Sequence, residues 1–141
     1  MFGFALWDSR HRKLMLARDR LGIKPLFYAL EDNGLFLGSE LKSILMSGEI
    51  EREIDVYALK DLFTIGFVQA PKTLFSKIRR LLPGHYLLYQ DGTSSIHKYW
   101  DLHFPTLYED TTNRSPVEWV EALRAKLEER QYESTYGVMF Q

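Results

Sequence analysis

Two side chains of opposite charge, Arg18 and Asp19, are adjacent in a short connection between two apolar runs, within residues 16–28. Gly22 and Pro25 belong to the same connection. Glycine tolerates a positive φ and proline fixes φ, so this sequence predicts a rigid, positioned loop. A guanidinium and a carboxylate in such a loop can bind a charged substrate or hold the loop through an internal salt link. Polar loop residues mostly serve turn geometry, so the pattern favours the structural role and predicts no catalysis.

The composition excludes several other kinds of chemistry. The chain has no cysteine, which rules out disulfides, thiolate metal sites and cysteine nucleophiles within it. The four histidines, His11, His85, His97 and His103, are scattered without the spacing of a metal site. Glycine-rich phosphate loops and the H-E-x-x-H pattern do not occur. The sequence therefore predicts no catalytic residue and no metal site.

The balance of charges indicates which binding partners the chain can attract. Lys and Arg number 18 against 19 Asp and Glu, a formal net charge of −1, which gives no field to attract nucleic acid or anionic lipid. Two basic clusters, residues 10–13 and 77–80, are interpreted as solvated faces, with phosphate binding as the minor alternative. No apolar run has the length of a membrane span, and the N-terminus lacks a signal-peptide pattern. We expect a cytoplasmic protein without nucleic-acid or membrane partners.

The elements that must position the charged loop are predicted from hydrophobic patterning. Four strands are expected at residues 2–7, 13–17, 26–30 and 35–38, the last two joined by an Asn-Gly hairpin turn. Ser39 is predicted to cap a first helix. Asp55 is predicted to cap a second helix, which Gly66 ends. Four antiparallel strands followed by helices on one side indicate an α+β layered fold.

The second half of the chain has a different pattern of apolar and polar residues. An amphipathic piece at residues 75–82 precedes a hairpin formed by residues 85–89 and 95–100. Residues 104–114 are predicted to be a linker. A helix that begins with a capping box is then predicted from Ser115, Pro116 and Glu118. Its apolar stripe is expected to pack against another part of the protein. Residues 136–141 are interpreted as the start of a buried strand.

Five segments, taken in order, carry a family resemblance. They are MFGFALWD (1–8), ARDRLGIKPL (17–26), LGSELK (37–42), LPGHYL (82–87) and YWDL (99–102). Each is a modest motif, but their order and spacing together closely resemble glutamine-dependent asparagine synthetases along the length of the chain. The intervening residues 65–75 are similar to the longer bacterial and archaeal version, which includes asparagine-synthetase-like proteins of polysaccharide gene clusters.

The resemblance implies an architecture with two linked sites. Residues 1–103 would be the C-terminal part of a class II glutamine amidotransferase domain, an αββα sandwich of antiparallel sheets with the N-terminal-nucleophile hydrolase fold. Residues 104–114 would be the linker, and residues 115–141 the truncated start of an ATP pyrophosphatase domain. The family's nucleophile is an N-terminal cysteine whose own α-amine acts as the base. Its substrates are glutamine, aspartate and ATP, with Mg, and its product is asparagine.

The same resemblance implies that the reacting groups lie outside these residues. The family's cysteine, glutamine-binding arginine, Asn-Gly segment and substrate-binding aspartate align upstream of Met1, and Phe2 offers no thiol or hydroxyl. Val138 and Phe140 would approach the nucleotide, but Gln141 stands where the family's phosphate-binding serine is expected. Residues 133–136 also depart from the family pattern. We therefore expect a fragment that binds no cofactor and is inactive alone.

The remaining site residues receive supporting roles under this resemblance. Arg18, Asp19, Gly22 and Pro25 would shape the loop beside the interdomain seam, and Ser39 with Glu40 would begin a helix behind the sheet. Alternatives to the fragment hypothesis are a non-catalytic half that complements a separate chain or pairs with itself, an asparagine-synthetase-like amidotransferase of polysaccharide biosynthesis, and an unrelated binding module. Half a sandwich would leave apolar area exposed and favour aggregation.

Overall fold

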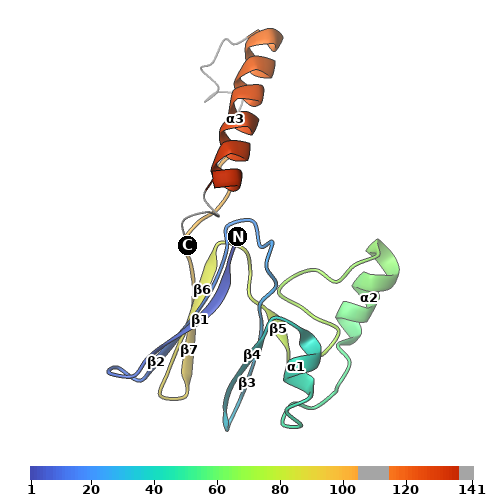
Figure 1. Cartoon of the computed structure of the whole chain (residues 1–141). Helices are drawn as coiled ribbons and strands as arrows, with labels where there is room; N and C mark the ends of the chain where they lie inside the picture. The colour runs from blue at the N-terminus through green and yellow to red at the C-terminus, as the bar shows by residue number, and fades with distance from the viewer. Residues whose placement is uncertain (105–114, 137–141) are drawn as a thin grey trace. The chain divides into compact units, whose positions relative to one another are not determined.

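The computed structural model describes the backbone of residues 1–104 and 115–136 and the side chains of residues 1–104 and 115–129. It divides into two compact units, Met1–Leu102 and His103–Gln141. The first unit holds all the strands of the described residues, and the second holds one helix (Figure 1). The expectations for residues 105–114 and for Val138 and Phe140 fall outside the described residues.

Two antiparallel sheets form the first unit. Sheet A contains, in spatial order, β1 (Gly3–Asp8), β2 (Lys13–Arg18), β6 (His85–Gln90) and β7 (Thr93–Lys98). Sheet B contains, in spatial order, β4 (Gly34–Gly38), β3 (Phe27–Glu31) and β5 (Arg79–Arg80). The predicted strands and both hairpins are confirmed, with boundaries shifted by a residue or two. The α+β fold class is confirmed as well.

The connection after β2 carries the chain from one sheet to the other. Strand β2 pairs with β1 and β6, whereas β3 pairs with β4 and β5, so the first four strands do not form one sheet. Periodicity along each strand indicates which residues face inward but not which strands pair. The Arg18–Pro25 connection therefore lies where the two sheets are joined.

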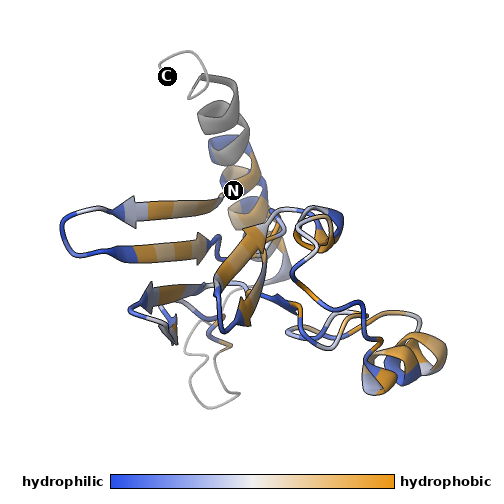
Figure 2. Ribbon diagram, turned by 90° about the horizontal axis from the view of Figure 1, so that it is seen from below, coloured by the Kyte–Doolittle hydropathy of each residue, from blue (hydrophilic) through white to orange (hydrophobic). Residues whose placement is uncertain are grey.

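The core consists of two clusters, one on each face of sheet B. Leu16, Leu26, Leu81 and Leu87 pack between the sheets, with Tyr28 and Leu35 at their edge. Phe27, Ala29, Ile44, Ile50 and Ile78 fill the other face, where α1 (Leu41–Leu45) packs on β3 and β4. Consecutive residues of β3 thus enter different clusters, as the two-residue period of a strand requires. Figure 2 shows the apolar residues following the strands.

The outer face of sheet A lacks a covering layer in the first unit. Phe4 and Leu6 on β1 share this face with Met15 on β2 and Leu88 on β6, because these residues are in register across the strands. Phe4 is 40% exposed and Leu6 is 57% exposed. Among the described residues of this unit no helix packs on sheet A (Figure 1). The unit therefore supplies the α, β and β layers of an αββα sandwich.

The two predicted helices after β4 are present, but one cap is assigned differently. Asp55 accepts hydrogen bonds from the backbone N–H groups of Tyr57 (2.9 Å) and Ala58 (3.1 Å), which confirms its capping of α2 (Val56–Ile65). Gly66 ends α2 with a φ of 83°. The predicted Ser39 cap is wrong: α1 begins at Leu41, its N-cap residue is Glu40, and no side chain caps it. Ser39 lies one residue too early to reach the first amides of the helix.

The helix of the second unit, α3 (Pro116–Tyr136), begins as predicted. The Ser115 N–H donates to Glu118 Oε2 (2.6 Å), and the Glu118 N–H donates to Ser115 Oγ (3.4 Å), which confirms the capping box. The predicted stripe residues are largely exposed: Trp119, Val120, Leu123 and Leu127. Tyr136 is the last helical residue, so the strand predicted from residue 136 does not begin there.

Candidate functional site

The Asp19 carboxylate organises the loop that follows β2. Its Oδ1 accepts hydrogen bonds from the N–H groups of Leu21 (3.2 Å) and Ile23 (3.1 Å), and its Oδ2 accepts one from Lys24 (3.1 Å). The side chain is only 5% exposed. Burial acts to raise the pKa of Asp19, but these backbone donors outweigh it and leave the pKa below its usual value. Asp19 is thus held as an anion by the loop itself.

The Arg18 guanidinium completes the arrangement from the other side. Nε donates to the Lys24 carbonyl (2.8 Å), one terminal nitrogen donates to Leu81 O (2.6 Å), and the other donates to Gly22 O (2.6 Å). Arg18 is 6% exposed, and this burial is the main reason why its pKa is lowered. Arginine remains charged at neutral pH even so. One side chain therefore joins the loop to the segment that precedes β6.

The predicted salt link between Arg18 and Asp19 is not the contact that forms. In the described part of the chain these two residues do not form an ion pair with each other. Each binds the backbone: the anion collects N–H groups and the cation collects carbonyls. We call this arrangement, with Gly22 and Lys24, the Arg18–Asp19 cage. Charged hydrogen bonds to backbone fix a loop more firmly than an exposed ion pair, because each bond also removes an unpaired buried group.

Two glycines allow the cage to close. Gly22 has a φ of +66°, and a Cβ there would lie 2.7 Å from Pro83 Cγ and 3.1 Å from Arg18 Cζ. Gly84 has a φ of +65°, and its N–H donates to the Asp19 carbonyl (3.0 Å). The predicted role of Gly22 as a positive-φ position is therefore confirmed. Gly84 also belongs to the cage, although in the sequence it stands out only as part of the LPGHYL motif.

The cage also contacts the last residues of the first unit. The Tyr99 hydroxyl donates to the Arg18 carbonyl (2.7 Å), and the Trp100 N–H donates to Gly84 O (3.2 Å). The Arg20 guanidinium lies 5.8 Å from the centre of the Trp100 ring. The cage is thus tied to residues 99–100, immediately before the first unit ends at Leu102.

The cage gives the Asp19 carboxylate a testable pH dependence. The pKa of Asp19 is lower in the folded chain than in the unfolded chain, where a carboxylate of this kind has a pKa near 3.9. The ionised carboxylate therefore stabilises the fold at pH values above about 3.9. This stabilisation is lost as the pH falls through the folded-state pKa. Asp19→Asn should lower the free energy of unfolding by about 2 kcal/mol at pH 7, since the amide nitrogen cannot accept from an N–H. The difference from wild type should shrink below pH 4.

Urea unfolding of both chains at pH 7, 5 and 3 measures this dependence. Asp32→Asn, in the exposed turn before β4, is the control and should match wild type at every pH. A deficit of Asp19→Asn that stays the same at pH 3 would contradict the role of the carboxylate charge.

A hollow of about 500 Å³ lies beside the cage. Its lining residues are Met1, Phe2, Gly3, Lys24, Pro25, Ser39 and Glu40. The structure therefore brings Pro25 together with Ser39 and Glu40, two predicted sets that are separate in sequence. Arg18 and Asp19 do not line the hollow but bind the Lys24 backbone on both sides. Gly3 and Lys24 also line the hollow, and the sequence does not predict this, although both lie inside the family motifs at residues 1–8 and 17–26.

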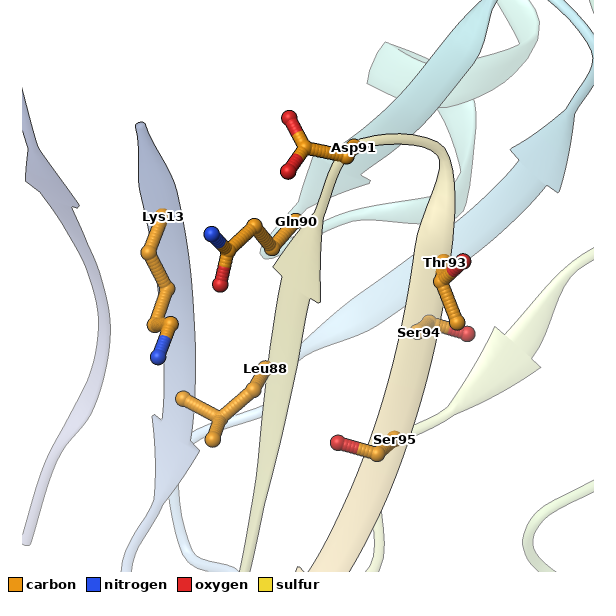
Figure 3. Close-up of a pocket in the computed structure, with 7 residues that line it drawn as sticks. All are labelled: Lys13, Leu88, Gln90, Asp91, Thr93, Ser94 and Ser95. Carbon is orange, nitrogen blue, oxygen red and sulfur yellow. The ribbon is translucent and has the colours of Figure 1, made fainter. Parts of the chain in front are cut away.

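A second hollow, of about 410 Å³, lies on the hairpin of β6 and β7 (Figure 3). Lys13, Leu88, Gln90, Asp91, Thr93, Ser94 and Ser95 line it. The Gln90 amide donates to the His11 carbonyl at 3.3 Å, which ties the hairpin to the neighbouring turn. The hollow touches no residue of the cage, and we assign it no role.

The described residues place no reacting group at the first hollow. They contain no cluster of His, Asp and Glu that could hold a metal ion, and the whole chain has no cysteine. Lys24, Ser39 and Glu40 offer charge and hydrogen bonds, with Glu40 paired to Lys42 at 2.8 Å. These three residues can position the backbone and form one wall of the hollow. The described helices also include none long and apolar enough to cross a membrane.

The fold and this loop define a class of protein. Residues 1–100 match the family model described as a glutamine amidotransferase domain, and the chain belongs to this family. It is 37% identical over 103 residues to glutamine-hydrolyzing asparagine synthetase 3 of Bacillus subtilis (strain 168), covering 72% of this chain and 17% of that protein. It is 44% identical over 87 residues to a putative glutamine-hydrolyzing asparagine synthetase of Mycobacterium tuberculosis (strain ATCC 25618 / H37Rv), covering 60% and 13%.

Similarity also extends beyond the first unit. The chain is 36% identical over 127 residues to Amidase chry2 of Gibberella zeae, covering 89% of this chain and 18% of that protein. That coverage exceeds the length of the first unit, so it includes part of the second. The chain spans less than a fifth of each of these relatives, 17% and 18% for the first two matches. The resemblance to glutamine-hydrolysing asparagine synthetases is confirmed at the level of the family.

Proposed function

We infer that this chain is part of a glutamine-hydrolysing asparagine synthetase, in which it forms the scaffold of the glutaminase domain. The full enzyme would release the amide nitrogen of glutamine and use it, with ATP and Mg, to convert aspartate to asparagine. The observation that carries this proposal is the Arg18–Asp19 cage beside the hollow, in a chain of the glutamine amidotransferase family. As the sequence predicts, we place the enzyme in the cytoplasm.

In this proposal, residues 1–141 support the reaction without taking part in it. Lys24, Ser39 and Glu40 form one wall of the glutaminase site, and the cage holds Lys24 in place. The nucleophile is proposed to come from another part of the enzyme, since residues 1–141 include no cysteine. The groups that bind ATP are also proposed to lie elsewhere. The chain by itself is therefore proposed to be inactive.

The cage is also proposed to lie beside the seam between the glutaminase and synthetase domains. The hydrogen bond from Tyr99 to the Arg18 carbonyl supports this position, because it joins the loop to the end of the first unit. In this proposal Arg18, Asp19, Gly22 and Pro25 shape and stiffen the loop beside the seam.

A chimaera tests the proposed function. Residues 1–102 replace the matching stretch of glutamine-hydrolyzing asparagine synthetase 3 of B. subtilis, and asparagine formation is measured with glutamine and with ammonium as nitrogen donors. The proposal expects both activities to persist. A second chimaera carries Arg18→Met and should lose glutamine-dependent synthesis while keeping ammonium-dependent synthesis. Loss of the glutamine-dependent activity in the first chimaera, with the ammonium-dependent activity intact, would contradict the proposal.

A further inference from the structure

The chain leaves the first unit through residues 99–102, and the backbone of this exit segment is bound to one glycine. The N–H groups of Tyr99 (2.8 Å) and Trp100 (3.2 Å) both donate to the Gly84 carbonyl. Gly84 in turn donates its own N–H to the Asp19 carbonyl at 3.0 Å. A single glycine therefore binds the exit segment with its carbonyl and the Arg18–Asp19 cage with its N–H.

Side chains make a second connection between the exit segment and the loop after β2. The Tyr99 hydroxyl donates to the Arg18 carbonyl at 2.7 Å, across 81 positions of the sequence. The Arg20 guanidinium lies 5.8 Å from the centre of the Trp100 ring, within the range of a cation–π contact. Arg18 and Arg20 flank Asp19, whose carboxylate organises the loop. The exit segment therefore contacts the loop on both sides of its organising residue.

The other end of the loop forms part of the hollow. Lys24 lines the hollow, and its backbone is bound on both sides. Its N–H donates to Asp19 Oδ2 (3.1 Å), and its carbonyl accepts from Arg18 Nε (2.8 Å). Arg18 and Asp19 are buried, and buried charged groups that already bind backbone have no solvent to replace those partners. The printed hydrogen bonds thus connect the exit segment to Lys24 through two buried side chains.

We propose that Tyr99 is a positioning residue, which through its hydroxyl holds the loop so that Lys24 stays at the hollow. The wall of the hollow then depends on how the chain leaves the first unit. The side chain of Tyr99 is 41% exposed, so the ring is not required to fill the core, and the hydroxyl accounts for a tyrosine at this position. The consequence for activity rests on the proposed function, in which the hollow belongs to the glutaminase site.

Native-state hydrogen exchange of the full chain tests the positioning role without any activity. The amides of Ile23 and Lys24 bind the Asp19 carboxylate and not Tyr99, so they report on the loop itself. Their exchange requires these hydrogen bonds to open locally. Tyr99→Phe removes only the hydroxyl, and it should raise the exchange rates of both loop amides about fivefold, the effect of losing one hydrogen bond that restrains the loop.

The Ala58 amide is the matched reference, because it also binds a carboxylate, that of Asp55, at the start of α2. Its exchange rate should change less than about twofold in Tyr99→Phe. Tyr57→Phe is the matched control variant, since it removes the hydroxyl of a tyrosine that is 76% exposed, and it should leave the two loop amides as in wild type. An equal rise at the loop amides and at Ala58 in Tyr99→Phe, or no rise at the loop amides, would overturn the proposal.

Kinetics of the chimaera that carries residues 1–102 test the consequence for the site. Tyr99→Phe in that chimaera should raise the KM for glutamine about fivefold and leave ammonium-dependent asparagine formation unchanged, because only the wall of the glutaminase site is loosened. An unchanged KM for glutamine would overturn the positioning role. A parent chimaera without glutamine-dependent synthesis would instead contradict the proposed function, and the exchange rates of the loop amides would still decide whether Tyr99 positions the loop.

Discussion

Arg18→Met should lower the free energy of unfolding of the chain by about 4 kcal/mol, the largest effect expected of any single side-chain replacement in the cage. The guanidinium is buried and donates to three carbonyls, those of Gly22, Lys24 and Leu81. Hydrogen bonds to a charged group contribute about 1.5–3 kcal/mol each, and bonds made by one side chain are not additive. Methionine fills much of the same volume but leaves these carbonyls without a donor.

Urea denaturation at pH 7 measures this loss, with two comparison variants. Arg18→Lys keeps the charge but not the planar set of donors, and should lose about 2 kcal/mol. Arg20→Met removes an exposed guanidinium that lies over the Trp100 ring, and should lose less than about 1 kcal/mol. A loss below 1 kcal/mol for Arg18→Met would show that the cage does not hold the loop.

Gly84→Ala should be nearly as damaging, with an expected loss of about 3 kcal/mol in the free energy of unfolding. Its φ of +65° disfavours any side chain, and a Cβ would collide with the carbonyl oxygen of Trp100. That carbonyl belongs to backbone, so it cannot move aside without disturbing residues 99–100, which bind the Gly84 carbonyl in return.

The variant Gly92→Ala is the control that shows how much of the Gly84→Ala loss comes from backbone strain and how much from the collision with Trp100. Gly92 has a φ of +77° in the turn between β6 and β7, and a Cβ there would meet nothing within 4 Å. Strain alone should lower the free energy of unfolding by about 1 kcal/mol. Equal losses for the two alanine variants, measured by urea denaturation, would show that packing at residues 84 and 100 adds nothing to the cage.

Much of the fold can be predicted from local pattern, because local pattern decides local structure. The Asp55 cap, the Gly66 end of α2 and the Ser115 capping box depend on residues within one helical turn, and the structure confirms each. The error at Ser39 has the same local origin. Serine, glutamate and glycine before a helix allow more than one starting residue, and side-chain preference alone does not choose among them.

The pairing of strands could not be predicted in this way. Alternation along residues 13–18 indicates which side chains point inward, but β6, more than sixty residues later, is the strand beside β2. The same limit applies to the cage. Adjacent Arg18 and Asp19 suggest a mutual salt link, whereas one guanidinium nitrogen reaches Leu81 across 63 positions. Gly84 becomes part of the site through a long-range contact of its own, the hydrogen bond from its N–H to the Asp19 carbonyl.

The family resemblance indicates the site residues more than the chemistry of their side chains does. Pro25, Ser39 and Glu40 meet at one hollow, which no spacing in the sequence indicates. The sequence does not predict a role for Lys24, because an exposed lysine in a loop carries no signal by itself. Its place between Asp19 and Arg18, bound through both of its backbone groups, is what distinguishes it.

In the function proposed above, residues 1–141 provide the scaffold of a glutamine-hydrolysing domain without its reacting groups. The direct measurement is the release of glutamate from glutamine by the purified chain, compared with a mock preparation. A scaffold without reacting groups should give equal glutamate in both preparations at every chain concentration. Glutamate release that rises in proportion to the chain, and that Arg18→Met abolishes, would contradict it.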